Sequence, residues 1–437
     1  MDADAIVIGA GAAGLAAARR LARANFSVIL LEARDRVGGR VLSERAGSTG
    51  HFAELGAEFI HGSAAETMEL LREANLSSVS TEGESWVCGD DGRLRREERD
   101  FAGTTGGIFE KTSALEKDES VADFLRRFEH DPAMRESVRA ARSFVEGFDA
   151  ADPQIASARA IADELRSGVD SKSARPAGSY HGMFKELEKA CIREGVELSL
   201  RTMVRRIAWS RGDVIVETTS DAHTETVRAR TAIVTLPAGV LQFRGDETAV
   251  VFEPGLPQAK LEALRYIEMG HVVKLALQFR SRFWERIEGG RYRAAAFFRP
   301  ANDAFAAYWV QDPLHGTIVT AWAGGPKARA IEDLGDAALI ERAVNGLGTM
   351  LGAVELAREE LEGAIHHDWT HDPFSRGAYS YVRVGGRNVR EQLAEPLDSA
   401  VFFAGEATAT GGEGGTVNGA LATGYKAAAR AVRALRG

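Results

Sequence analysis

Length, composition and charge exclude several classes of protein. The chain has 437 residues, enough for about two or three domains. Its 54 Lys and Arg residues are outnumbered by 63 Asp and Glu, a formal net charge of −9, which argues against a general nucleic-acid-binding protein. Two cysteines, Cys88 and Cys191, are too few for a disulfide framework or a thiolate zinc site and suit a reducing compartment such as the cytoplasm. No stretch approaches the roughly 20 apolar residues of a membrane helix.

The N-terminal segment has the pattern of a strand, a glycine-rich turn, a helix and a second strand. Residues 5–8, AIVI, form a continuous apolar run, as in a parallel strand that is buried on both faces. Residues 9–14, GAGAAG, follow, and the alanine-rich stretch 15–24 is a strong helix former. Residues 27–31, SVILL, form the second strand, which ends at Glu32. This βαβ unit indicates an α/β fold.

The turn carries the spacing GxGxxG in the context that binds dinucleotides. Gly9 allows the tight turn, Gly11 lets the backbone approach a pyrophosphate, and Gly14 lets the helix pack closely on the sheet. The pyrophosphate would lie at the helix N-terminus, where backbone N–H groups lack partners. Glu32, 23 positions after Gly9, suits a hydrogen bond to a ribose hydroxyl. A glycine turn without a ligand is the alternative interpretation.

Two types of segment, one charged and mostly helical and the other of α/β type, alternate along the rest of the chain. Residues 86–173 are charged and indicate an inserted, mostly helical domain, with a possible helix cap at Ser120. The α/β elements that follow are a helix over 184–194, strands over 196–198, 207–209, 214–216, 232–236, 271–279, 294–298, 307–310 and 317–322, a helical stretch over about 336–361, a strand over 401–404 and a long helix over 416–435. The alternation predicts domains that are interleaved rather than consecutive.

Seven blocks spread over nearly the whole chain resemble one family. They are LEARDRVGGR (31–40), ELGAEFIHG (54–62), TMVRRI around Val204, TLPAGVL (235–241), HVVKLALQF (271–279), WTHDPFSRGAYSY (369–381) and FAGEATATGGEGGTVNGA (403–420). In this order they resemble the flavin-containing amine oxidases, which include monoamine, polyamine and spermine oxidases, L-amino-acid oxidases and flavin histone demethylases. The IHG ending and the DPFSRGAYSY segment look closest to polyamine and spermine oxidases.

The resemblance implies an α/β protein with two interleaved domains. The first is a Rossmann-type FAD-binding domain of glutathione-reductase type, which we expect over 1–75, 180–245 and 385–437. The second is a substrate domain of α+β type, with a mixed sheet plus helices, which we expect over 76–179 and 246–384.

The resemblance also identifies the cofactor as FAD. Ala378 stands where monoamine oxidases carry the cysteine that bonds the flavin, so we expect the FAD to be non-covalent. The helix that begins at Thr416 would direct its positive end at a reduced flavin, which is anionic around N1 and O2. The residues expected to contact FAD are Gly9, Gly11, Ala13, Gly14, Glu32, Ala33, Arg34, Gly38, Gly39, Arg40, Gly56, Ala57, Glu58, Phe59, Val204, Pro237, Trp369, Gly405, Glu406, Gly415, Thr416, Val417 and Ala420.

Four residues are expected at the reaction site by the same resemblance. In similar enzymes the lysine at the position of Lys274 holds a water against flavin N5, and its charge stabilises superoxide, although the residues alone favour a solvent-facing strand lysine. Tyr379 corresponds to one wall of an aromatic cage and Trp369 lies near the flavin, while packing in the core is the unaided interpretation of both. His61 is a candidate for positioning the amine, and a core or surface histidine is the alternative.

Two features of the expected pocket depart from the family's pattern. Glu58 is a candidate for binding a cationic nitrogen, but the polyamine oxidases have a different residue there. The second wall of the aromatic cage comes from the glycine-rich loop in monoamine oxidases, whereas this chain offers only Gly414, Gly415 and Thr416. We therefore expect a more open pocket than that of an arylalkylamine oxidase.

The implied activity is FAD-dependent amine oxidation. Hydride would pass from the amine α-carbon to flavin N5, the imine would hydrolyse to an aldehyde plus ammonia or an amine, and O2 would reoxidise the flavin to give H2O2. The substrate would be a polyamine or another primary or secondary amine. An L-amino-acid oxidase on the same scaffold is the alternative, and would need a cation such as Arg299, Arg376 or Arg383 for the substrate carboxylate. Lys274 argues against a flavin desaturase, and no basic domain supports a chromatin-binding module.

The expected partners are a small amine and O2, with no nucleic acid, membrane or metal. The histidines and aspartates of residues 366–372 have spacings that would permit a metal site, but the segment coincides with a flavin-family block that binds none. The sequence leaves the choice between a monomer and a homodimer open.

Overall fold

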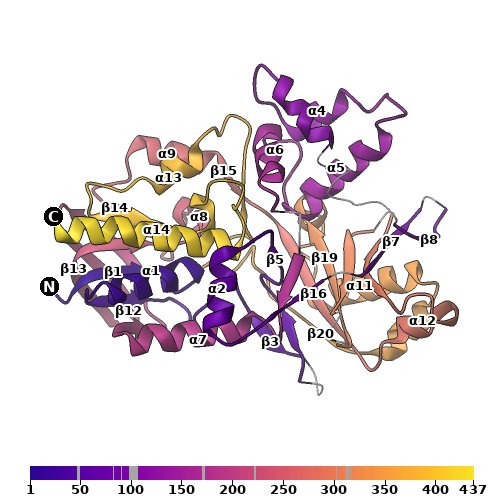
Figure 1. The fold of residues 1–437 in the computed structure, drawn as a ribbon, viewed down its shortest axis with the longest axis horizontal. Helices are drawn as coiled ribbons and strands as arrows, with labels where there is room; N and C mark the ends of the chain where they lie inside the picture. Colours follow the sequence, from indigo (N-terminus) through magenta and orange to yellow (C-terminus); the bar gives the residue numbers. More distant parts are fainter. Residues whose placement is uncertain are drawn as a thin grey trace.

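The computed structural model describes residues 1–46, 50–81, 83–89, 91–97, 107–169, 173–220, 223–301, 303–311, 314 and 316–437. Figure 1 shows two β-sheets with their helices, the first on the side of the two termini and the second on the opposite side. Indigo, magenta and yellow segments meet in the first half, so distant parts of the chain build it together. In the described ranges no helix has both the length and the apolar character that crossing a bilayer requires.

The first sheet runs in the order β10-β2-β1-β13-β12-β11-β14, with β22 paired to β13. Strands β10, β2, β1, β13 and β22 pair in parallel, whereas β11, β12 and β13 form an antiparallel meander. The strands are β1 (Ala3–Ile8), β2 (Val28–Leu31), β10 (Val196–Ser199), β11 (Met203–Ser210), β12 (Asp213–Ser220), β13 (His223–Val234), β14 (Val251–Glu253) and β22 (Val401–Phe403). The predicted α/β fold is thus confirmed.

The apolar run of β1 explains its central place in this sheet. Because side chains alternate along a strand, Val7 points into one apolar core, while Ile6 and Ile8 point into another. A strand that is buried on both faces suits a parallel sheet covered on both sides. The carboxyl ends of β1, β2 and β13 meet at one edge, where ligands bind in open α/β sheets.

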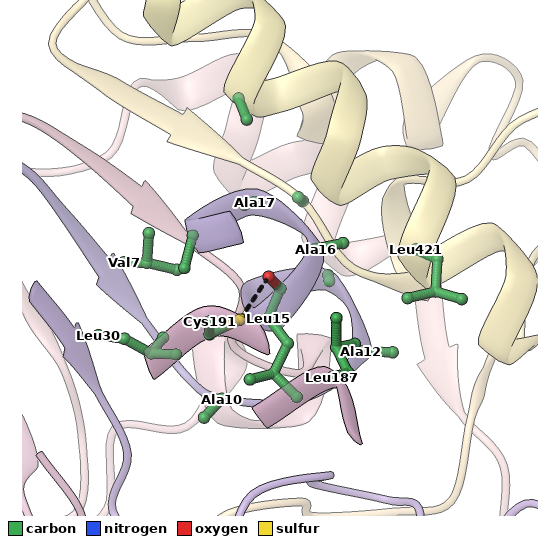
Figure 2. Close-up of a cluster of buried hydrophobic side chains, with 14 of the residues drawn as sticks. Val7, Ala10, Ala12, Leu15, Ala16, Ala17, Leu30, Leu187, Cys191 and Leu421 are labelled. Carbon is green, nitrogen blue, oxygen red and sulfur yellow. Dashed lines mark hydrogen bonds between the residues drawn. The ribbon is translucent and has the colours of Figure 1, made fainter. Parts of the chain in front are cut away.

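Helices cover one face of the first sheet, and Figure 2 shows the apolar layer beneath them. The covering helices are α1 (Ala12–Arg23), α2 (Ala65–Glu73), α7 (Tyr180–Arg193) and α14 (Val417–Arg436). Leu187 and Cys191 of α7 pack beneath α1, and the Cys191 thiol donates a hydrogen bond to the Leu15 carbonyl oxygen at 3.5 Å. A Cβ at Gly424 would lie 2.2 Å from the Ala13 carbonyl oxygen, so this glycine lets α14 pack directly on α1.

The second sheet runs in the order β20-β16-β19-β18-β17-β7-β8. Its strands are β7 (Glu84–Cys88), β8 (Leu94–Arg96), β16 (Val272–Phe279), β17 (Ala295–Arg299), β18 (Ala307–Val310), β19 (Ile318–Gly324) and β20 (Leu361–His366). Helices α11 (Asp336–Met350) and α12 (Val354–Glu360) share its core. Leu275 and Leu277 of β16 point into this core, and Lys274 therefore points to the opposite face.

Residues 86–88 and 94–96 contradict the predicted helical insertion at its start. They belong to the antiparallel strands β7 and β8, and β7 pairs in parallel with β17. Trp86 is buried in the second core, where its ring lies edge-on to Tyr292 at 4.9 Å. Burial of this aromatic residue in a sheet decides the local structure over the charged neighbours. Residues 90, 98–106 and 170–172 of the predicted insertion lie outside the described residues.

The described remainder of the insertion is largely helical, as predicted. It contains η1 (Glu110–Ala114), α4 (Val121–Arg126), α5 (Arg135–Gly147) and α6 (Ala158–Arg166). Phe124, Phe144 and Ile161 bury one another between these helices. The Ser120 hydroxyl accepts a hydrogen bond from the Asp123 backbone N–H at 3.0 Å, so the predicted cap is confirmed.

The remaining elements lie around and between the two sheets. They are the pairs β3 (Ser43–Arg45) with β4 (Phe52–Glu54) and β15 (Ile267–Met269) with β21 (Ser380–Val382), the sheet β5 (Ile60–His61), β9 (Ser173–Pro176) and β6 (Ser78–Ser80), and the helices α8 (Ala238–Gln242), α9 (Gln258–Arg265), η2 (Phe283–Gly289), α10 (Gly325–Arg329), α13 (Val389–Ala394) and η3 (Glu406–Thr408).

The structure differs from the predicted border between residues 245 and 246. Strand β14 pairs with β11 of the first sheet. Leu264 and Ile267 share a core with Ile6. Residues 251–269 thus pack with the first sheet, because their apolar side chains cover its second face.

Candidate active site

A cavity of about 1270 Å³ begins at the carboxyl edge of the first sheet and reaches the second sheet. Gly9, Glu32 and Gly405 line it at the ends of β1, β2 and β22, while Lys274 and Trp309 line it from β16 and β18. This volume exceeds the roughly 300–1,000 Å³ of ordinary small-molecule sites. The cavity therefore has room for an extended ligand together with a second, smaller one.

The structure brings the predicted site residues together. Every residue that the sequence assigns to FAD or to the reaction lines this cavity, except Gly14. A Cβ at Gly14 would lie 1.8 Å from the Gly9 carbonyl oxygen. Gly14 therefore serves the packing of α1 on its own turn, and its expected contact with the cofactor is not supported.

The end of the cavity at the first sheet offers backbone donors. Helix α1 has Gly11 as its N-cap, so no capping side chain bonds the first N–H groups of the helix. A Cβ at Gly11 would approach the Gly38 carbonyl oxygen no closer than 4.0 Å and would project into the cavity. The Glu32 carboxylate is held by the backbone N–H groups of Ala10 at 2.7 Å and Arg34 at 2.9 Å. This arrangement suits a pyrophosphate beside a ribose.

An ion-pair cluster closes this end of the cavity. Arg34 donates hydrogen bonds to Asp372 at 2.7 Å and to the Ser375 hydroxyl at 2.9 Å. Although burial opposes ionisation, His367 and Arg34 lower the pKa of Asp372 to about 2. The described residues include no group of three or more side chains that could hold a metal ion. In the same segment, His367 Nε2 lies 2.7 Å from Asp372 Oδ2 and His371 Nδ1 lies 2.7 Å from Asp368 Oδ2.

Glu406 joins three separate segments at the middle of the cavity. Its carboxylate accepts hydrogen bonds from Arg40 at 2.8 Å, from the Ser380 hydroxyl at 2.7 Å and from the Gly415 backbone N–H at 3.0 Å. Burial opposes its ionisation, but Arg40 and Arg390 hold the pKa of Glu406 below its ordinary value. Glu406 thus fixes the turn after β2, the start of β21 and the loop before α14.

Helix α14 directs its N-terminus at the same region. The Thr416 hydroxyl caps it by accepting a hydrogen bond from the Gly419 backbone N–H at 2.9 Å. Thr416 and Val417 line the cavity, so the partial positive charge of a 20-residue helix faces it. A Cβ at Gly415 would lie 3.1 Å from the Tyr379 ring, which leaves this side of Tyr379 without a second aromatic wall.

The other end of the cavity contains a buried ammonium group. Lys274 is only 3% exposed, so the solvent-facing alternative for this residue is wrong. Its Nζ donates hydrogen bonds to the Glu58 carboxylate at 2.8 Å and to the Gly56 carbonyl oxygen at 3.0 Å. Glu58 also accepts hydrogen bonds from Arg175 and Trp309. A charge in a buried cavity acts more strongly on its surroundings than one in water.

Aromatic side chains surround the space beside Lys274. The His61 ring meets the Phe148 ring edge-on at 4.9 Å, and burial lowers the pKa of His61 to about 4. The Tyr379 hydroxyl donates a hydrogen bond to the Phe148 carbonyl oxygen. Trp369 is buried and its indole N–H donates to the Leu55 carbonyl oxygen at 2.8 Å. His61 is therefore neutral near pH 7, in a pocket that would favour a neutral ligand.

Comparison with known proteins identifies the family. A model of the flavin-containing amine oxidoreductases matches residues 12–432. The chain belongs to this family. It is 30% identical to polyamine oxidase 3 of Oryza sativa subsp. japonica, an alignment that covers 97% of this chain and 88% of that protein. It is 26% identical to a lysine-specific histone demethylase 1 homolog 2 of the same organism, but covers only 57% of that protein.

Solved structures share the fold of this amine oxidoreductase. A putrescine oxidase bound to putrescine has a TM-score of 0.81 and 21% identity, with 98% of both chains covered. Cyclohexylamine oxidase from Brevibacterium oxydans has a TM-score of 0.82 and 22% identity, with both chains fully covered. The predicted family, fold class and FAD cofactor are thus confirmed, and the protein is an amine-oxidising flavoenzyme.

The cavity of this amine oxidoreductase fits FAD. The two helix N-termini provide positive ends for phosphate and flavin, and the missing side chain at Gly11 leaves a cradle beside α1. Glu32, Arg34, Arg40 and the turn between them would hold the adenosine and pyrophosphate parts.

The expected role of Glu58 in binding a cationic nitrogen is not supported. Both of its oxygens already accept hydrogen bonds from cations or indole of the chain itself. Lys274 and Arg175 keep the pKa of Glu58 below its ordinary value despite the opposing effect of burial. A carboxylate that is neutralised by two cations has little remaining attraction for a third.

The three arginines of the amino-acid oxidase alternative lie in different places. Arg299 lines the cavity and forms an ion pair with Glu97. Arg376 and Arg383 are not among the residues that line it. Arg376 donates a hydrogen bond to Thr248, and Arg383 pairs with Glu268 at 3.3 Å.

Sequence reasoning missed three residues of this site. Arg175 reaches Glu58 from β9, and Trp309 and Trp322 line the cavity with ring centroids 5.7 Å apart. The alternation of β18 and β19 could have placed the tryptophans on one face of the sheet. The segment around Arg175 carries no such signal.

Proposed function

We propose that this protein is an oxidase that converts an amine, O2 and water into an aldehyde, H2O2 and ammonia or a shorter amine. FAD, when bound, accepts a hydride from the carbon beside the amine nitrogen and passes the electrons to O2. The observation that carries the proposal is the position of Lys274. Its buried ammonium lines the same cavity as the N-terminus of α1, so a fixed positive charge is available where O2 would acquire negative charge.

The chain's residues would orient the substrate and exclude water. Tyr379, Trp369 and His61 line the cavity, and the desolvation that such side chains impose favours the neutral form of an amine over its ammonium form. Neutral His61 can accept a hydrogen bond from the amine. The residues expected to contact FAD, apart from Gly14, would bind it without a covalent bond, since Ala378 offers no nucleophile.

As substrate we favour a polyamine or another primary or secondary amine over an amino acid. The identity of 30% to a polyamine oxidase supports this choice. The pairing of Arg299 with Glu97 weighs against a carboxylate site. Both described cysteines are free, which suits our proposal of a cytoplasmic enzyme.

The test is to mix the purified protein with amines in the absence of O2 and to follow bleaching of the flavin. The panel contains spermine, spermidine, an acetylated polyamine, putrescine, benzylamine, tyramine and several L-amino acids. We expect rapid bleaching by at least one amine, followed by H2O2 release when O2 is admitted. Bleaching by amino acids alone would contradict the proposed substrate class, and re-oxidation without H2O2 would contradict the oxidase.

A further inference from the structure

A buried cluster of charges lies beside the site of the proposed oxidation. Lys274, Glu58, Arg175 and Trp309 are 3%, 5%, 5% and 6% exposed. Lys274 Nζ lies 2.8 Å from Glu58 Oε2, and Arg175 Nε lies 3.0 Å from Glu58 Oε1. The Trp309 indole N–H lies 3.0 Å from both carboxylate oxygens. Four segments, β16, β9, β18 and the turn before β5, therefore meet at one carboxylate.

The two cations of the cluster differ in their hydrogen bonds and in their access to the cavity. A carboxylate has about four acceptor positions. In Glu58, Oε1 accepts hydrogen bonds from Arg175 and Trp309, and Oε2 accepts them from Lys274 and Trp309. An ammonium has three N–H donors, and the structure shows Lys274 using two of them, toward Glu58 and Gly56. Lys274 lines the cavity, but Arg175 is not among its lining residues.

The charges of the cluster do not cancel. One carboxylate accepts hydrogen bonds from two cations, so Lys274, Glu58 and Arg175 together have a net charge of +1. Among the described residues, Glu54 on β4 interacts electrostatically with Lys274 and Glu58 and adds a negative charge above its pKa, and His61 on β5 lines the same cavity as Lys274. Burial raises the pKa of Glu54 to about 7 and lowers that of His61 to about 4. Removal of one partner from a buried ion pair leaves an uncompensated charge.

We propose that Glu58 and Arg175 are positioning residues that hold Lys274 charged and directed into the cavity. Glu58 fixes the ammonium and offsets the cost of its burial. Arg175, which does not line the cavity, offsets the charge of Glu58. The positive charge of Lys274 is therefore not cancelled. The inference rests on the proposed function, because Lys274 is the residue that would act on O2.

Glu54 provides a matched control for Glu58. Both are buried glutamates of one short segment. Glu54, however, accepts its hydrogen bonds from the Ser43 hydroxyl and the Tyr180 backbone N–H, which are uncharged. Replacing Glu54 tests the effect of losing a buried carboxylate without losing the direct partner of Lys274.

The experiment compares holoenzyme of the wild type, Glu58→Gln, Glu58→Asp, Glu54→Gln and Lys274→Met. The flavin is reduced chemically, O2 is added, and the re-oxidation rate is followed between about pH 8 and 10, since loss of the carboxylate partner disfavours the charged form of a buried ammonium. We expect at least about a tenfold fall across this range in Glu58→Gln, against less than about threefold in the wild type and Glu54→Gln. Glu58→Asp, which keeps the charge, should restore the flat profile.

A second measurement does not depend on catalysis. The absorption spectrum of the oxidised flavin, recorded over the same pH range, should shift in Glu58→Gln with the same midpoint as the rate and should stay constant in Lys274→Met. A loss of rate in Glu58→Gln that is independent of pH, with an unshifted spectrum, would overturn the proposal, because it would indicate structural damage alone.

The outcomes distinguish the two proposals. If Lys274→Met is re-oxidised at the wild-type rate, the role of Lys274 in the proposed function fails, and the spectral titration still decides whether Glu58 holds its charge. If the Glu58→Gln variant does not retain FAD, the Arg175→Gln variant tests the proposal in its place. Loss of that cation should slow re-oxidation at least about threefold at every pH, and an unaltered rate would contradict the part assigned to Arg175.

Discussion

The two ends of the cavity differ in the chemical groups that line them. At the first sheet, the donors are backbone N–H groups at the start of α1, held open by Gly9 and Gly11. At the second sheet, the groups are side chains: the ammonium of Lys274 and the rings around Tyr379 and His61. The first set comes from one continuous turn, and the second from strands and loops far apart in the sequence.

This difference predicts which kind of substitution impairs each end of the cavity. A backbone site depends on the absence of side chains, so added atoms damage it most. A side-chain site depends on particular charges and rings, so removed atoms damage it most. Substitutions at the two ends should therefore separate FAD binding from reaction rate.

The largest effect is expected for Gly11→Val. Gly11 has φ −74°, which any residue adopts, so the valine meets no backbone strain and its side chain instead fills the cradle beside α1. We expect loss of FAD from the purified protein, measured by the flavin absorbance per chain. Gly11→Ala adds one carbon and should retain more FAD than valine does. A fully loaded valine variant would place the pyrophosphate elsewhere.

Lys274→Met should have the next largest effect, at the other end of the cavity. Loss of a preorganised charge should slow re-oxidation of the reduced flavin by O2 about 10²-fold. The FAD content and the rate of anaerobic reduction by amine should change little, because methionine fills a similar volume. Stopped-flow absorbance measures both half-reactions. Equal slowing of both would argue against a specific role toward O2.

Tyr379→Ala should lower kcat/KM for amines about three- to tenfold, the value of an aromatic contact. Tyr379→Phe is the control, since it keeps the ring and loses only the hydrogen bond to the Phe148 carbonyl oxygen. Steady-state assays of H2O2 release measure both variants. If alanine and phenylalanine have equal effects, the hydroxyl and not the ring is the important group.

The smallest effect concerns the pH dependence of stability. The pKa of His61 is about 4 in the folded protein and about 6.5 when unfolded. The unfolded chain therefore binds more protons between these values, and stability falls as the pH falls from 6.5 toward 4, by on the order of 2 kcal/mol at pH 5. His61→Phe should reduce the loss of Tm between pH 7.5 and 5. A substitution at exposed His130 is the control. The assignment would be contradicted if His61→Phe lost as much Tm as the wild type, or if the His130 variant reduced the loss of Tm equally.

The nucleotide end was predictable because its information is local. The βαβ unit, the glycine spacing and Glu32 lie within 32 residues, and hydrophobic periodicity set the strands around them. The resemblance added Lys274 and Tyr379. Arg175 could not be predicted, because its role depends on β9 pairing beside β5. The saturation of Glu58 and the strand conformation of Trp86 also depend on tertiary contacts that no local pattern contains.

The order of the first sheet has a consequence for biosynthesis. Strand β1 pairs on one side with β2 but on the other with β13, and α1 packs against α14. A chain emerging from the ribosome therefore presents β1 with an unpaired edge until residue 234 has appeared, and the exposed face of α1 is covered only after residue 417 onward is made. Closure of the FAD-binding half thus waits for α14, and until β13 has appeared the nascent chain carries an aggregation-prone edge.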